Sequence, residues 1–253
     1  MNLFLDALAW LFSPERLVGS NALPVRIGEH LLYTGISVAL AAVIAVPLGY
    51  LIGHTGRGRE VAVGFSGAAR ALPSLGLILL LVLLIGVTGM ERATAAVIAF
   101  VLLAIPSLLA GAYAGIQAID RTTVDAARAM GMTQWQVLTK VEIPLGLPLL
   151  IGGLRSSVLQ VVATVTLAGY VNLGGLGYPL LQGLELRRYE QILGASLLVI
   201  ALALLLEGLL AVAERIAVPR GALAGRATDV RGAPTRRRPA AGTPAPREES
   251  ISS

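Results

Sequence analysis

Polar side chains recur at helical spacing inside one apolar segment in the second half of the chain. They lie three or four positions apart, so a helix would carry them on one face. The candidates are Ser156, Ser157, Gln160 and Thr164. Because polar groups that face hydrocarbon are costly, this face should turn towards protein or water. The pattern favours either the wall of a permeation path between two subunits or interhelical packing by small polar side chains.

Two features beside this stripe have open interpretations. The guanidinium of Arg155 could extend to the lipid headgroups, pair with an acid such as Glu207, or help to gate a path. Three glycines that follow the segment permit tight backbone turns: Gly174, Gly175 and Gly177. They predict either a broken element beside the path or an ordinary turn.

Reactive chemistry has few candidates in this chain. The single lysine, Lys140, follows Thr139, which excludes the Gly-Lys-Ser/Thr phosphate loop of an ATPase. Cysteine is absent, which excludes thiol catalysis and cysteine metal ligands. His30 and His54 match no metal-ligand spacing and are interpreted as packing residues near the membrane edges. We therefore expect no catalytic residue, no metal and no cofactor, and a membrane-embedded enzyme is the least favoured class.

Composition and hydropathy indicate that lipid surrounds most of the chain. Only 14% of the 253 residues are charged and 55% are hydrophobic, whereas about a quarter of a soluble domain is charged. Apolar blocks of about 20 residues, the length that crosses a bilayer as a helix, occur five times. They lie near residues 31–52, 71–90, 93–114, 147–171 and 192–213. The predicted fold is an all-α integral membrane protein of the inner (plasma) membrane with about five transmembrane helices.

The chain divides into three regions by composition. Residues 1–27 form an extracytoplasmic or interfacial segment, since their apolar start is too short to span. Residues 28–218 form the transmembrane domain, and residues 219–253 form a disordered, basic tail. Placing that tail in the cytoplasm puts most Lys and Arg residues inside, as the positive-inside rule requires. Membrane orientation thus explains the net charge of +5 without a nucleic-acid partner.

The connection between the third and fourth apolar blocks, residues 115–146, carries helix signals of its own. A capping box with Thr122 as N-cap begins one helix, and Gly131 falls where a left-handed C-cap would end it. Thr133 begins a second capping box, and Pro144 would stop the second helix. The pattern predicts two short helices around a glycine turn on the cytoplasmic side, a compact element suited to docking another protein.

Within this connection, three small or acidic residues precede a glycine and a later proline. The positions are Asp125-Ala126-Ala127, Gly131, Val141, Ile143 and Pro144. They resemble the EAA loop of ABC-importer permeases, with Asp in place of Glu, Val in place of Ile and Ile in place of Leu. The resemblance implies a coupling helix that sits in a groove of a cytoplasmic ATPase subunit. The residues expected to couple the two chains are Asp125, Ala126, Ala127, Gly131, Trp135 and Pro144.

Further stretches are similar to the osmoprotectant branch of these permeases. They are residues 71–75, 125–136, 147–155 and 172–177, within a resemblance that extends from about residue 28 to 215. The resemblance implies a type I importer fold and a dimer of permeases, with two ATPase subunits and an extracytoplasmic substrate-binding protein. The implied cargo is a small compatible solute such as glycine betaine, carnitine or choline. A methionine-type permease, which shares this layout, is an alternative, and a passive channel is a weaker one.

Overall fold

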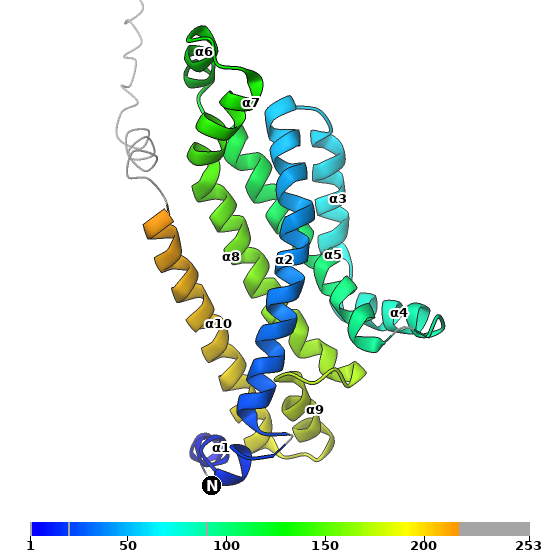
Figure 1. The fold of residues 1–253 in the computed structure, drawn as a ribbon. Helices are drawn as coiled ribbons and strands as arrows, with labels where there is room; N and C mark the ends of the chain where they lie inside the picture. The colour runs from blue at the N-terminus through cyan, green and yellow to red at the C-terminus, as the bar shows by residue number, and fades with distance from the viewer. Residues whose placement is uncertain (1, 20, 90, 218–253) are drawn as a thin grey trace, which may run out of the picture. The chain divides into compact units, whose positions relative to one another are not determined.

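Four apolar blocks of the sequence form long helices in the computed structural model, which describes residues 2–19, 21–89 and 91–217 (Figure 1). These helices are α2 Leu23–Thr55, α5 Arg92–Gln117, α8 Ile143–Leu167 and α10 Tyr189–Ala217. Each is long and apolar enough to cross a bilayer, because about 20 residues suffice at about 1.5 Å per residue. The tail predicted at residues 219–253 lies outside the described residues.

The remaining apolar block forms a bent pair of helices rather than one helix. The sequence places this span at residues 71–90, but the structure has α3 Arg59–Ala71 and α4 Ser74–Gly86, bent by 91°. Pro73 explains the break, because the residue before a proline is kept out of helical geometry. Leu72 is accordingly extended, with a ψ of 131°. The two helices together provide the fifth span if the bent pair is taken as one.

Helix α5 is the most buried of the long helices and packs along α8 through glycine. A Cβ added at Gly115 would lie 2.5 Å from the carbonyl oxygen of Gly146. A Cβ added at Gly153 would lie 2.9 Å from the Cα atom of Gly111. Both distances are shorter than van der Waals contact, so the two backbones touch directly at these levels.

Helix α2 also packs against α5 through glycine near its C-terminal end. A Cβ added at Gly49 would lie 2.5 Å from the Cβ atom of Ala112, and one at Gly53 would lie 2.9 Å from the Cβ atom of Ile116. Large buried side chains fill the core that these helices share, among them Phe100, Leu108, Val161 and Val162. Helices α2, α5 and α8 therefore form one tightly packed unit.

The N-terminal segment contains a short helix, α1 Leu3–Leu11, which packs against α10. The ring of Trp10 makes this contact, since a Cβ added at Gly194 would lie 2.7 Å from its Cε3 atom. Helix α2 begins at Leu23, so the boundary predicted after residue 27 falls inside a helix. The short helix α9 Gly177–Glu185 precedes α10.

Candidate functional site

Helix α6, Arg121–Ala129, is the first of the two short helices in the connection at residues 115–146. Its N-cap is Asp120, whose carboxylate accepts a hydrogen bond of 2.9 Å from the backbone N–H of Thr122. The predicted capping box with Thr122 as N-cap is therefore wrong, because an aspartate two residues earlier already caps the helix. The same hydrogen bond lowers the pKa of the Asp120 carboxyl below its ordinary value.

A glycine turn ends α6, as the sequence predicted. Gly131 has a φ of +83°, which glycine adopts without steric cost. Its N–H donates to the carbonyl of Arg128 at 2.9 Å. The N–H of Met132 donates to the carbonyl of Ala127 at 3.3 Å, which completes the Schellman pattern. The turn therefore satisfies carbonyls at the end of α6 and reverses the chain within a few residues.

Helix α7, Gln134–Val137, begins with the second predicted capping box. The hydroxyl of Thr133 accepts from the N–H of Gln136, and the side chain of Gln136 accepts from the N–H of Thr133. Pro144, however, does not stop this helix. The chain continues through a π-helical turn, Leu138–Glu142, directly into α8, where Pro144 occupies the first turn. The proline is tolerated because the π turn before it has already changed the hydrogen-bond register.

The two short helices present apolar side chains to the outside. Met130 is 77% exposed and Trp135 is 71% exposed. Beside α6 lies an open pocket of about 440 Å³, lined chiefly by Ala126, Ala127, Met130, Met132 and Val141. Exposed apolar surface of this kind is typical of sites that contact another protein or a membrane.

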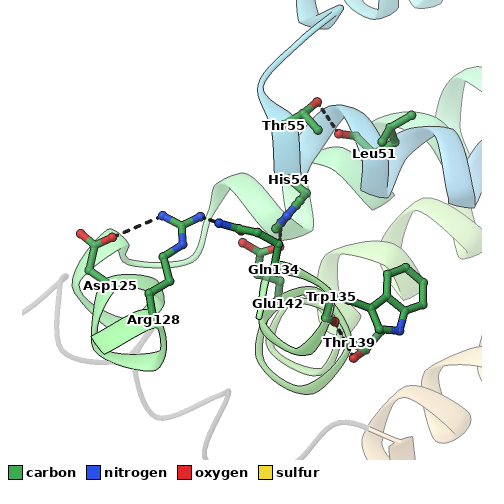
Figure 2. A network of polar contacts seen from close by, with 9 residues as sticks. All are labelled: Leu51, His54, Thr55, Asp125, Arg128, Gln134, Trp135, Thr139 and Glu142. Carbon is green, nitrogen blue, oxygen red and sulfur yellow. Dashed lines mark hydrogen bonds and ion pairs between the residues drawn. The ribbon is translucent and has the colours of Figure 1, made fainter. Parts of the chain in front are cut away.

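Polar contacts link the two short helices to each other (Figure 2). The guanidinium of Arg128 lies 3.5 Å from the carboxylate of Asp125 and donates to the side chain of Gln134 at 3.4 Å. Most of the predicted coupling residues are exposed: Asp125, Ala126, Gly131 and Trp135. Ala127 is buried, and Pro144 is half-buried in the first turn of α8.

A polar pocket of about 350 Å³ lies against α8. Its polar lining comes from four helices: Arg70 of α3, Ser74 of α4, Ser107 of α5, and Ser156 and Gln160 of α8. Ser156 and Gln160, two of the four polar residues predicted to share one face of a helix, therefore line the same pocket. Arg70, Ser74 and Ser107 were not among the predicted site residues, although Ser107 is an isolated polar residue in an apolar run.

The other two stripe residues are buried in helix packing. The hydroxyl of Ser157 donates to the carbonyl of Ala104 in α5 at 3.3 Å. The hydroxyl of Thr164 donates to the carbonyl of Gln160 within α8 at 2.6 Å. Neither lines the polar pocket. Ser157 points about 100° away from Ser156, and Thr164, seven residues after Ser157, lies on the same side of the helix as Ser157. The predicted stripe is thus divided between two faces of α8.

Arg155 links α8 to α10 and does not line the polar pocket. Its guanidinium forms an ion pair with Glu207, the partner that the sequence suggested. It also donates to Glu214 at 2.8 Å. Glu214 was not predicted as a partner of Arg155, although it lies seven residues after Glu207 and so on the same face of a helix. Of the three roles left open for Arg155, pairing with acids is the one that the structure has.

The glycine-rich stretch after α8 forms a tight turn that is docked on α2. Gly174 and Gly175 have φ values of +95° and +62°. The N–H of Gly175 donates to the carboxylate of Glu29 at 2.8 Å, and a Cβ at Gly174 would lie 2.5 Å from the same carboxylate. Gly177, the first residue of α9, contacts the carbonyl of Thr166 too closely for a side chain. None of the three glycines lines the polar pocket on α8.

His30 completes this docked turn. It is fully buried, its Nδ1 atom accepts from the N–H of Leu176 at 3.3 Å, and its Nε2–H donates to the carbonyl of Val162 at 3.1 Å. Packing was the role predicted for this histidine. Within residues 2–19, 21–89 and 91–217, no group of three or more His, Asp or Glu side chains could hold a metal ion.

The chain is similar to known transport proteins over most of its length. The family described as "Binding-protein-dependent transport system inner membrane component" matches residues 45–220. The glycine betaine/carnitine/choline transport system permease protein OpuCB of Bacillus subtilis is 33% identical over 196 residues, which cover 78% of this chain and 88% of that protein. The osmoprotectant import permease protein OsmW of Salmonella typhimurium is 32% identical, with coverage of 76% and 90%.

Solved structures confirm the predicted type I ABC-importer permease fold. The inward-facing methionine ABC transporter MetNI has a TM-score of 0.70 at 23% identity, and the match covers 78% of this chain and 97% of that one. An amino acid ABC transporter with histidines has a TM-score of 0.60 at 21% identity, with coverage of 84% and 97%. This chain is a multi-pass protein of the inner membrane, and it belongs to the family of binding-protein-dependent transport system inner membrane components.

Proposed function

We propose that this chain forms the path by which a small compatible solute, such as glycine betaine, carnitine or choline, crosses the inner membrane. The observation that carries the proposal is the 33% identity, over 78% of the chain, to a permease named for these three solutes. A separate ATPase subunit drives transport, and an extracytoplasmic binding protein delivers the solute. A second permease chain, identical or similar, provides the other half of the path.

The path follows the face of α8 that the described residues of this chain leave uncovered. Four exposed residues recur along it every three or four positions: Gly152, Ser156, Gln160 and Ala163. They are small or polar, whereas the exposed side chains of α10 include Leu204, Leu205 and Leu209, which suit lipid. A polar face in a membrane needs water or protein beside it. The second permease chain supplies that protein, and the pocket around Ser156 and Gln160 opens between the two.

The exposed knob formed by α6 and α7, residues 121–137, is the contact for the ATPase subunit. Its apolar side chains Met130 and Trp135 have no cover within the described residues of this chain. The knob is continuous with the path helix, since the helical stretch Gln134–Val171 contains both α7 and α8. A displacement of the knob by the ATPase is therefore transmitted along the backbone to the residues that line the pocket.

Transport by the assembled complex in liposomes tests this proposal. The permease, its ATPase and its binding protein are reconstituted, and uptake of labelled glycine betaine, carnitine, choline and methionine is compared with and without ATP. We expect ATP-dependent uptake of at least one of the three quaternary ammonium solutes. ATP-dependent uptake of methionine alone would contradict the cargo. Uptake that needs no ATP would favour the passive channel.

A matched pair of substitutions tests the position of the path. Gln160→Leu removes a polar group from the pocket, and Leu205→Ile changes a side chain on the exposed face of α10. We expect Gln160→Leu to lower the uptake rate by about tenfold, the factor that corresponds to about 1.4 kcal/mol. Leu205→Ile should leave uptake unchanged. Equal uptake by the two variants would place the path elsewhere.

A further inference from the structure

One polar contact joins two segments that lie 88 residues apart in the sequence (Figure 2). The Nδ1 atom of His54, in the last turn of α2, lies 2.5 Å from the carboxylate of Glu142. Glu142 is the final residue of the π-helical turn that joins α7 to α8. Both side chains are largely shielded, with exposed fractions of 15% and 5%. We call this contact the His54–Glu142 strut.

Burial makes the strut a strong constraint on geometry. A carboxylate removed from water is costly unless it is paired. Among the described residues, His54 is the hydrogen-bond partner that the structure gives to the Glu142 carboxylate. If the two elements move apart, the Glu142 carboxylate loses this hydrogen bond.

The π turn is the place where such a constraint matters. Residues 138–142 depart from the regular i to i−4 hydrogen bonding of an α-helix, and π turns inside helices are frequent at functional sites. An unsupported hinge between the knob and α8 would absorb part of any displacement of the knob. Glu142 lies at the α8 side of that hinge, and His54 holds it against α2.

Helix α2 is in turn fixed to the rest of the bundle. Gly49 and Gly53, in the same C-terminal part of α2 as His54, bring this helix into backbone-level contact with Ala112 and Ile116 of α5. A force that reaches His54 is therefore passed on to α5 as well as α2. Without the strut, the knob is joined to the bundle by its two backbone connections, residues 118–120 to α5 and the π turn to α8.

We propose that His54 and Glu142 are positioning residues that make the base of the coupling knob, α2 and α8 move as one body. The strut prevents bending at the π turn, so that displacement of the knob tilts α2 and α5 together with α8, the helix that lines the polar pocket. This inference rests on the proposed function, in which the knob at residues 121–137 receives the movement of an ATPase subunit.

The number of solute molecules taken up per ATP hydrolysed tests the strut in the reconstituted complex. His54→Ala, Glu142→Ala and the double variant are compared with Thr55→Ala, a neighbouring control. The Thr55 hydroxyl donates to the carbonyl of Leu51 in its own helix and accepts from the backbone N–H of Arg57, so it bonds to neither α7 nor α8. We expect each single strut variant to lower the ratio by roughly tenfold while ATP hydrolysis continues, within the range of measured coupling between contacting residues. The double variant should fall no further than the lower single variant. His54→Gln, which keeps an N–H donor, should recover part of the ratio.

Two results would overturn the strut. One is an unchanged ratio in His54→Ala, and the other is a double variant that loses the product of the two single losses. The proposed function fails differently, because the unmodified complex would then show no ATP-dependent uptake, and the strut would fall with it. Normal ATP-driven uptake in the unmodified complex with a lowered ratio only in the strut variants supports both.

A cross-link answers the same question if the alanine variants fail to assemble. The sequence contains no cysteine, so His54→Cys with Glu142→Cys introduces the only two thiols of this chain. A short, cleavable thiol reagent then joins them within the assembled complex. Because the strut holds its two ends together throughout the transport cycle, cross-linked complex should keep its ATP-driven uptake. Loss of uptake on cross-linking, with recovery after cleavage, would show that the two ends must separate and would refute the proposal.

Discussion

Adjacent glycines of α8 provide a sharp test of the backbone contact between α5 and α8. A Cβ at Gly153 would lie 2.7 Å from the carbonyl oxygen of Ser107 and 2.9 Å from the Cα atom of Gly111, whereas one at Gly152 meets nothing within 4 Å. The carbon–carbon distance must grow by about 0.6 Å to reach the shortest favourable separation of about 3.5 Å. Neither neighbour can yield by rotating a side chain, because both are backbone atoms. The helices themselves must therefore separate.

Gly153→Ala and Gly152→Ala share the same gain in helix propensity, about 1 kcal/mol, so their difference isolates the packing cost. Overpacking of this kind costs about 1–3 kcal/mol, and we expect Gly153→Ala to be less stable than Gly152→Ala by that amount. The midpoint of denaturant unfolding of the full chain in detergent micelles, measured without partner subunits, gives the comparison. Equal midpoints would refute the close approach of α5 and α8.

Three further expectations concern a helix cap, a turn and an ion pair. Because the folded-state pKa of Asp120 is lowered, its stabilisation of α6 is present at neutral pH and is lost as the pH falls through that pKa. NMR titration of the Thr122 amide should show this loss. Asp120→Asn should abolish the pH dependence of the Thr122 signal. Gly131→Ala places a side chain at a φ of +83°, which costs about 1–2 kcal/mol. This substitution should weaken both the turn and ATP-driven uptake. Intact uptake would contradict the role of the turn. Arg155→Gln leaves Glu207 without its cation, so the midpoint of unfolding in detergent should fall. Arg155→Lys should restore part of that loss. An unchanged midpoint in Arg155→Gln would show that the pair adds nothing to the stability of the fold.

Apolar runs in the sequence predict the long helices correctly because the signal for a membrane helix is local. A run of apolar residues needs lipid wherever the chain later places it, so α2, α5, α8 and α10 follow from composition alone. The same averaging hid the break at Pro73, where a restriction on one residue, Leu72, outweighs the hydropathy of the whole block. The prediction that Pro144 stops a helix was wrong for a different reason. A proline stops a helix in its interior but not in its first turn, and the sequence does not show where the π turn resets that count.

Tertiary partners account for the rest of what the sequence left undecided. Ser156 and Ser157 are neighbours of equal polarity, and the packing of α8 in the core, where the Ser157 hydroxyl donates to the carbonyl of Ala104 in α5, turns Ser157 inward. His54 and Glu142 meet across 88 residues, and neither carries a local signal that names the other. The glycine turn at Gly131 was predicted correctly, since its left-handed geometry depends on a few consecutive residues.

The meeting of bare peptide planes at Gly115 and Gly146 closes the seam between α5 and α8. A Cβ at either position would lie within 3 Å of the other backbone, so not even a methyl group fits there, and a water molecule or a trimethylammonium group is larger. In this arrangement no solute passes between α5 and α8 at the level of these two glycines. In the proposed function, the solute therefore runs along the outer flank of the pair, and a second permease chain encloses that flank.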